Sequence, residues 1–133
     1  MCIFCDIIEG KIPGKKVYED DDVLAILDIS QLTRGHTLVM PKKHVANILD
    51  CDEETLTKVI KVTKRLAGRI TTALKAPGCN ILNNCNPEAE QSVMHLHFHI
   101  IPRYGNEDCQ ISDFHPTHEP YDLDEILKEI ANN

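Results

Sequence analysis

A run of strict alternation, HLHFHII at residues 95–101, constrains the fold of this chain more than any other segment. Successive side chains of a β-strand point to opposite faces, so a strand here puts His95, His97 and His99 on one face. The large apolar side chains between them fall on the other face, where they need a core to cover them. One face of this strand is therefore expected to pack, and the other is free for chemistry.

Strand signals recur elsewhere in the chain. Apolar runs bounded by turn residues predict strands over 17–19, 23–28, 36–40, 81–82 and 93–101. The acidic turn 20–22 is expected to join the first two strands into a hairpin. Pro41 and Pro102 are expected to end the third and the fifth, because proline cannot donate a hydrogen bond to the ladder.

Two helices complete the predicted fold. Asp52 is placed to cap a helix that runs to about Leu74, with apolar residues at three- and four-residue steps, and Pro77-Gly78 ends it. Asp122 and Glu125 have the spacing of a capping box ahead of a last short helix. The apolar face of that helix comprises Leu123, Ile126, Leu127 and Ile130. This order of elements predicts an α+β fold whose mainly antiparallel sheet has about five strands.

Size and charge narrow the function classes. With 133 residues and neither repeats nor a flexible linker, residues 1–133 are expected to form a single domain. Fourteen basic residues against 21 acidic ones give a net charge of −7, which opposes stable binding to nucleic acid. No apolar run reaches the ~18 residues that cross a bilayer, and the first residues lack the pattern of a signal peptide. We therefore expect a cytoplasmic protein without a membrane segment.

Without a secretory signal, the six cysteines are expected as reduced thiols or metal thiolates. Those without a close partner in the sequence are expected to be plain thiols: Cys51, Cys79, Cys85 and Cys109. Cys2 and Cys5 form a C-x-x-C pair, which supplies two of the about four ligands that zinc needs. Taken alone, this pair fits two free thiols as well as half of a metal site.

The three aligned histidines fit two chemistries. In one, two or three imidazoles bind a catalytic zinc ion that activates water. In the other, one neutral imidazole attacks phosphorus and forms a covalent phosphoramidate. A small zinc module that binds nucleotide without turnover is a third alternative, because a fold does not by itself define a function.

Several motifs together resemble the histidine triad (HIT) superfamily of nucleotide hydrolases and transferases, and among its branches the Hint-type and bacterial HIT proteins. They are the triad at 95–99 preceded by Gln91-Ser92-Val93, the segment GHTLVMPKKH at 35–44, Asp28-Ile29-Ser30 and Asn83-Asn84, in family order and at family-like spacing. The resemblance covers about residues 2–102, so it implies a HIT-like core there and a tail at 103–133. It also implies a homodimer, for which an exposed sheet edge gives a physical reason.

The resemblance further implies cleavage at the α-phosphate of purine nucleotide conjugates, such as nucleoside phosphoramidates or dinucleoside polyphosphates. The middle histidine, His97, is then the nucleophile that forms a nucleotidyl-histidine, while His99 and His36 flank the phosphate and orient or protonate. With an ordinary pKa near ~6.5, a histidine is largely neutral at pH 7 and attacks without a separate base. The other implied nucleotide contacts are Asp28 at the ribose, Ile29 at the base, and Asn84, Gln91 and Ser92 at the phosphate.

A zinc site also follows from the resemblance. In zinc-containing members of the family, two histidines join the N-terminal cysteine pair, and the resemblance places them at His44 and His95. Together with Cys2 and Cys5 they would form a closed Cys₂His₂ set, which holds a structural zinc ion rather than a catalytic one. Rings two residues apart on a strand emerge about 6–7 Å apart, so His95 is able to bind zinc while His97 faces substrate.

Two positions depart from the family pattern. Glu90 stands where a glycine commonly precedes the glutamine, and Cys85-Asn86 replace a turn that commonly contains glycine. A side chain and a carboxylate there are expected to alter the loop backbone or to repel polyphosphate, which leaves the substrate range open. In the tail, His115 and His118 are expected in a solvated loop.

Overall fold

The computed structural model describes residues 1–105, 108 and 116–132. In chain order its helices and strands are α1 (Ile3–Ile8), β1 (Lys16–Glu19), β2 (Val23–Leu27), β3 (Thr37–Pro41), η1 (Ile48–Asp50), α2 (Glu53–Leu74), β4 (Gly78–Asn83), η2 (Pro87–Ala89), β5 (Phe98–Arg103) and α3 (Leu123–Ala131). The two η elements are single 3₁₀ turns. The predicted α+β class, with a five-stranded antiparallel sheet, one long helix and a short C-terminal helix, is confirmed.

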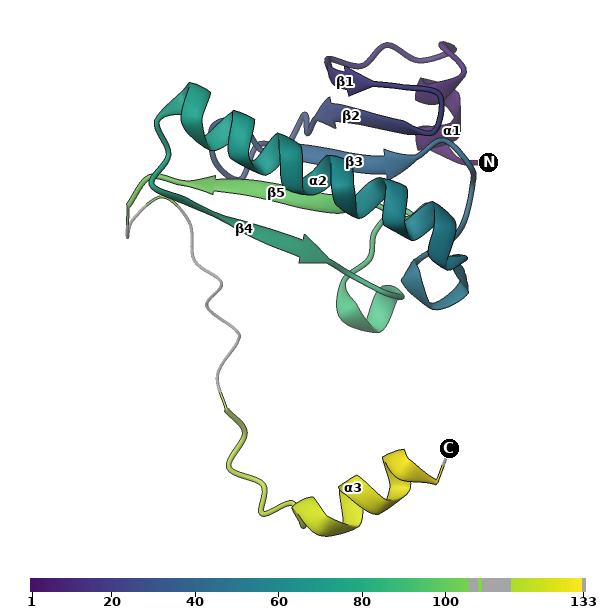
Figure 1. The fold of residues 1–133 in the computed structure, drawn as a ribbon, viewed down its shortest axis with the longest axis vertical. Coiled ribbons are helices and arrows are strands. Elements are labelled where there is room, and N and C mark those ends of the chain that lie inside the picture. The colour runs from purple at the N-terminus through teal and green to yellow at the C-terminus, as the bar shows by residue number, and fades with distance from the viewer. Residues whose placement is uncertain (106–107, 109–115, 133) are drawn as a thin grey trace.

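The sheet has the strand order β1-β2-β3-β5-β4, and each pair of neighbours is antiparallel. The predicted hairpin is present as β1 and β2. Its acidic turn is held by Asp20, whose Oδ1 accepts hydrogen bonds from the backbone N–H groups of Asp22 (2.7 Å) and Val23 (2.8 Å). β5 lies between β3 and β4 (Figure 1), so the strand that carries the histidines is in the interior of the sheet.

The long helix α2 covers one face of the sheet (Figure 1). It begins as predicted, because the Asp52 side chain accepts a hydrogen bond from the backbone N–H of Thr55. Buried residues of the helix and the sheet form one core cluster, which includes Val59, Val62, Leu66, Ile70, Val39, Leu96, Phe98 and Ile100. The apolar residues that alternate with the histidines are therefore in the core, as predicted, where each buried side chain stabilises the fold by roughly 1.5–3 kcal/mol.

The short helix α1 covers part of the opposite face. Phe4 and Ile7 pack there against Leu24 of β2 and Leu38 of β3. In the register of β3 and β5, Leu38 is opposite His99, and paired side chains point to the same face. His99 is therefore on the face opposite α2. The sequence did not predict α1, because a helix of six residues is too short to display its periodicity.

The histidine strand starts later than predicted. β5 begins at Phe98, not at residue 93, and residues 93–95 form bends. Backbone groups of this segment are bonded outside the sheet: Leu96 N–H donates to Val45 O at 2.8 Å, and Val93 O accepts from Gln91 Nε2 at 2.9 Å. Because His95 precedes the strand, strand alternation does not decide where its ring points.

The prediction that the two prolines end their strands is confirmed for β3 and is wrong by one residue for β5. Pro41 is the last residue of β3, opposite Val23, and β5 continues through Pro102 to Arg103. Pairing of β5 with β3 ends at Ile100, so the missing N–H of Pro102 removes no hydrogen bond between these strands.

Helix α3 begins as predicted after Asp122, whose Oδ1 accepts hydrogen bonds from the N–H groups of Asp124 and Glu125. Its four apolar residues are all exposed, and Figure 1 shows the helix apart from the sheet. Among the described residues, no helix combines the length and the apolar character needed to cross a bilayer. His118 is exposed, as predicted for a solvated loop, whereas His115 and Cys109 lie outside the described residues. The division into a core at 2–102 and a tail at 103–133 stays a prediction.

Candidate active site

The three histidines around the start of β5 lie in three different environments. His95 precedes the strand and faces the cysteines at the start of the chain. His97 lies beside His99, with ring centroids 5.0 Å apart, and His99 lies beside His36 at 5.2 Å. The rings therefore do not converge on one point, which disfavours a single catalytic metal ion bound by all three.

The ring of His97 is held from several sides. Its Nδ1 is 2.7 Å from the carbonyl oxygen of His95, an acceptor, so Nδ1 carries the proton and Nε2 keeps a lone pair. The Phe4 ring packs edge-on against it at 5.0 Å, and His99 flanks it. Burial lowers the pKa of His97 below its ordinary value. His97 is thus a neutral imidazole of fixed orientation with an unprotonated Nε2.

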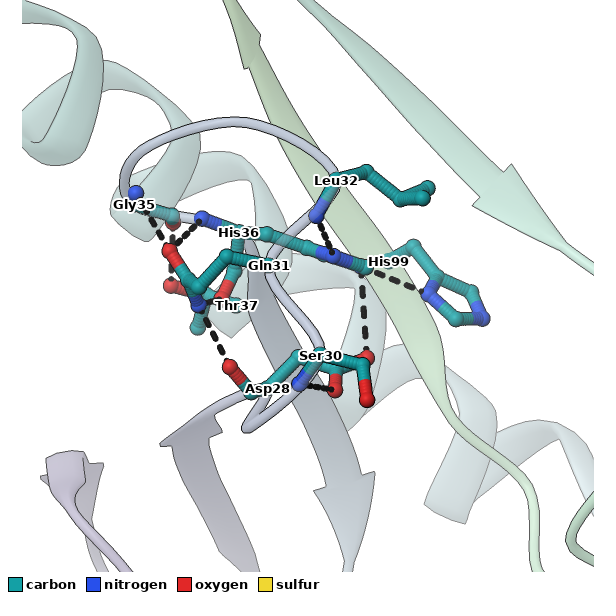
Figure 2. A network of polar contacts seen from close by, with 8 residues as sticks. All are labelled: Asp28, Ser30, Gln31, Leu32, Gly35, His36, Thr37 and His99. Atoms are coloured by element: carbon teal, nitrogen blue, oxygen red, sulfur yellow. Dashed lines mark hydrogen bonds and ion pairs between the residues drawn. The ribbon is translucent and has the colours of Figure 1, made fainter.

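His36 fixes the tautomer of His99 in the same way (Figure 2). The backbone N–H of Leu32 donates to His36 Nδ1 at 3.2 Å, so the His36 proton is on Nε2. That N–H donates to His99 Nδ1 at 2.9 Å, and Asp28 Oδ2 lies 3.7 Å from it. The remaining nitrogen of His99, Nε2, therefore carries a proton. His97 and His99 present opposite functions: one offers a lone pair and the other an N–H.

An acidic residue, Asp28, lies close to the His36–His99 pair. The ligand atoms of Asp28, His36 and His99 lie within 4.8 Å of one another, a spacing that suits a metal ion. The two rings already satisfy each other, because the His36 proton is donated to the lone pair of His99. The Asp28 carboxylate accepts from the backbone N–H of Ser30 at 2.8 Å through Oδ1, which leaves Oδ2 as the freer oxygen. Ile29, next in the chain, is almost fully exposed beside it.

Gln31 fastens the loop that carries these residues, and the sequence did not predict this. Its Nε2 donates to the carbonyl oxygens of Asp28 (2.6 Å) and His36 (2.8 Å). Its Oε1 accepts from the N–H groups of Gly35 (2.8 Å) and His36 (3.1 Å), as Figure 2 shows. All four hydrogen-bonding positions of the amide are therefore used within one loop.

Burial lowers the pKa of His99 to about 4, with further lowering from His97 and His36. A histidine in the unfolded chain titrates near 6.5, so the unfolded state binds more protons between pH 6.5 and pH 4. The contribution of neutral His99 to the free energy of unfolding is complete above pH 6.5 and is lost as the pH falls. We expect the free energy of unfolding to fall by about 2 kcal/mol between pH 7 and pH 5 through this residue.

Urea unfolding at the two pH values measures this change. In the variant His99→Asn the fall is expected to be smaller than in the native protein. The matched control His118→Asn, which alters an exposed histidine, keeps the native pH dependence. An unchanged pH dependence in His99→Asn would contradict the assignment.

Cys2, Cys5, His44 and His95 form the second group of ligands, with their donor atoms within 4.8 Å of one another. His95 Nδ1 lies 3.1 Å from His44 Nδ1 and 3.4 Å from Cys2 Sγ, and Cys5 Sγ lies 3.3 Å from His44 Nδ1. The other nitrogen of His95, Nε2, is 2.8 Å from Pro41 O, so its proton is there and Nδ1 faces the group with a lone pair. Two sulfurs and two ring nitrogens fit a tetrahedral metal ion.

The residues predicted at the phosphate lie in the loop between β4 and β5. This loop starts beside His97, because Asn83 Nδ2 donates to His97 O at 2.9 Å. Asn84 Nδ2 is 3.4 Å from Glu90 O. Gln91 is buried and both of its amide N–H groups are engaged, so its side chain has no donor left for a ligand. Ser92 is exposed and borders a hollow of about 820 Å³ beside the metal-ligand group.

The two departures from the family pattern coincide with unusual backbone angles. Asn86 has φ 76° and ψ 159°, and Glu90 has φ 68° and ψ 25°. Only glycine adopts positive φ without steric cost, which explains why a glycine is common at both places. The loop therefore keeps a glycine-like path although its sequence has a Cβ at each position.

The variant Glu90→Gly is expected to stabilise the protein by about 0.5–1 kcal/mol. Glycine removes the steric cost of the left-handed backbone, about 1–2 kcal/mol. The larger conformational entropy of glycine in the unfolded chain offsets part of that gain. Glu88→Gly, two residues earlier in η2, is the matched control and is expected to destabilise. Urea denaturation compares the two, and a change of the same sign in both would count against backbone strain at residue 90.

The HIT domain model matches residues 9–106. A crystal structure of a HIT family member from Bacillus subtilis is 45% identical, covers 99% of this chain and 96% of its own, and has a TM-score of 0.89. A histidine triad nucleotide-binding protein from Candida albicans is 34% identical, with coverage of 99% and 94% and a TM-score of 0.82. A HIT family hydrolase from Clostridium thermocellum is 31% identical, with coverage of 89% and 96% and a TM-score of 0.68.

Proposed function

The chain belongs to the HIT domain family, and from this membership we propose that it hydrolyses or transfers at the α-phosphate of purine nucleotide conjugates. Nucleoside phosphoramidates and dinucleoside polyphosphates are the substrate classes. One observation carries the proposal: the buried His97 ring is fixed through Nδ1 and has a lone pair on Nε2. The names of similar proteins, a nucleotide-binding protein and a hydrolase, agree with it.

In this mechanism His97 is the nucleophile. Its Nε2 forms a bond to the α-phosphorus while the bond from phosphorus to the leaving group breaks, and the leaving group takes a proton from solvent. The resulting nucleotidyl-histidine is cationic, and its Nδ1–H remains bonded to His95 O. Water then attacks phosphorus, releases the nucleoside monophosphate and restores the imidazole.

The charge that develops on the phosphoryl oxygens needs fixed donors. His99 supplies Nε2–H, because His36 occupies its other nitrogen. Asn84 and Ser92 contribute side-chain donors from the loop before β5. We assign Gln91 to the phosphate side as well, through the backbone segment that its buried amide holds in place.

The sugar and the base are assigned to the loop after β2. Asp28 Oδ2 is available to accept hydrogen bonds from the ribose hydroxyls. The exposed side chain of Ile29 offers apolar surface to a purine. The loop that carries both residues also carries His36, so binding of the nucleoside and orientation of His99 are linked.

We assign Cys2, Cys5, His44 and His95 to a structural zinc ion. Their donor set leaves no place for a substrate ligand in a tetrahedral site, so the ion would cross-link α1, the segment after β3 and the start of β5. His95 also accepts the Nδ1–H of His97 through its carbonyl oxygen, so holding His95 helps to orient the nucleophile. Two reduced cysteines at such a site suit the cytoplasm, where we place the protein.

We also propose a homodimer. The apolar face of α3 is exposed, and β4 is an edge strand whose Ile81 is exposed. Both surfaces gain from being covered. Measurement of the mass in solution is expected to give about twice 15.0 kDa, and a monomer at working concentration would contradict the proposal.

Chromatography tests the activity directly. The native protein is incubated with adenosine phosphoramidate, a diadenosine polyphosphate and their guanosine counterparts, and released nucleoside monophosphate is measured. Release from at least one conjugate, with preference for one class of leaving group, is expected. Tight nucleotide binding without release would instead favour a binding module.

A further inference from the structure

The side-chain amides of Asn47 and Gln91 join the loop at residues 84–92 to the rest of the protein. Asn47 and Gln91 are 4% and 5% exposed. Asn47 Nδ2 donates to Asn86 Oδ1 at 3.0 Å and to Gln91 Oε1 at 3.3 Å, and its Oδ1 accepts from Leu49 N–H at 3.0 Å. The sequence singled out Gln91 but not Asn47, whose position just before η1 is a common place for a capping asparagine.

Gln91 uses its whole amide in the same network. Its Oε1 accepts from the backbone N–H of Asn86 at 2.8 Å as well as from Asn47. Its Nε2 donates to Ala46 O at 2.6 Å and to Val93 O at 2.9 Å. Three separate segments are thus connected around two side chains, and among the described residues no buried side-chain N or O lacks a partner.

The network holds the most unusual backbone of the loop. Asn86 lies at φ 76°, ψ 159°, a region that only glycine occupies readily. Such a conformation persists only where the surroundings determine it. Asn86 is held at its N–H by Gln91 and at its side chain by Asn47. Hydrogen bonds from the two side-chain amides therefore hold Asn86 in a backbone conformation that a glycine would adopt without them.

The loop held in this way lies against the proposed nucleophile. It leaves β4 at Asn83, whose side chain donates to His97 O, and it returns through Ser92 toward His95. A displacement at Asn86 would move the donors of Asn84 and Ser92 relative to phosphorus. Misplacement of donors by about 1 Å is able to cost up to ~10²-fold in rate.

We propose that Asn47 is a positioning residue that holds the 84–92 loop on its glycine-like path and so aligns the phosphate-binding groups. This role rests on the proposed function for its effect on turnover. It does not rest on that function for its effect on the loop, which is measurable in the protein without nucleotide.

The test is a suppressor experiment. Asn47→Ala is expected to lower kcat by about ten-fold or more, with a smaller change in KM, because the alignment of the reacting groups is lost. Asn86→Gly removes the steric cost of positive φ at residue 86, so the loop no longer needs Asn47 to hold its conformation. The double variant Asn47→Ala, Asn86→Gly is therefore expected to recover to within about three-fold of the native kcat.

Thr63→Ala serves as the control for the loss of a buried polar group. Its hydroxyl, on a residue 1% exposed, donates to Val59 O within α2, on the sheet face opposite His99. It is expected to lower stability and leave kcat unchanged. A folded Asn47→Ala with native kcat, or a double variant as slow as Asn47→Ala, would overturn the proposal.

Amide hydrogen exchange separates this inference from the proposed activity. In Asn47→Ala the N–H groups of Asn86 and Gln91 are expected to exchange faster, while those of α2 keep their protection. If the native protein turned over no conjugate, the proposed function would fail, but the exchange result would still decide the role of Asn47. Unchanged exchange at residue 86 would refute that role.

Discussion

Replacement of His97 by alanine is expected to lower the release of nucleoside monophosphate by about 10³-fold or more, because the neighbouring His99 ring presents an N–H and not a second lone pair. The His97 ring lies between Phe4 and His99, and His95 O occupies its Nδ1. The fold should survive, since alanine removes one ring from the sheet face that α2 does not cover. Chromatographic product analysis and circular dichroism measure the two properties.

His118→Ala is the matched control for this loss. It removes an exposed histidine of the C-terminal segment and is expected to leave turnover at the native level. Mass spectrometry of acid-labile phosphoramidate on native protein, quenched during turnover, provides a second readout. Equal activity of His97→Ala and native protein would move the chemistry to another residue or to a metal-bound water.

The second large effect concerns the metal-ligand group. Protein purified without chelator is expected to contain about one zinc ion per chain, and Cys5→Ser is expected to lose most of it. Loss of the ion should lower the free energy of unfolding by on the order of 3 kcal/mol or more, because the cross-link of α1 to the start of β5 disappears. Metal analysis and urea unfolding measure the two changes.

Cys51→Ser controls for the loss of a thiol. Cys51 is half-buried outside the group, and its Sγ donates only to the neighbouring Asp52 O. This variant is expected to retain the metal and most of its stability. Far less than one zinc ion per native chain would contradict the assignment. Immediate and complete loss of turnover on chelation, without a change in stability, would point to a catalytic ion.

The strand that carries the three histidines was predicted only in part from the sequence. Alternation correctly placed Leu96, Phe98 and Ile100 in the core, because burial of large apolar groups is a strong and local signal. It did not give the position of the His95 ring, since the chain bends before Phe98 and long-range bonds replace strand pairing there. Only the family resemblance linked His95 to the cysteine pair.

Other parts of the site depend on contacts that no spacing encodes. The tautomers of His36 and His97 are set by a backbone N–H and a backbone carbonyl, groups that do not depend on the type of side chain. The roles of Gln31 and Asn47 likewise arise from where the chain folds back on itself. In contrast, Glu90 was noticeable from the sequence, because departure from a glycine preference is visible before the φ angle is known.

The paired tautomers at His97 and His99 have a consequence for the recognition of uncharged molecules. One ring offers an acceptor and its neighbour a donor, with ring centroids 5.0 Å apart. A neutral heterocycle with a complementary donor and acceptor would satisfy both nitrogens without a phosphate. Ligand screens against this site should therefore include uncharged bidentate fragments, since one ring nitrogen accepts and the other donates without a charge on the ligand.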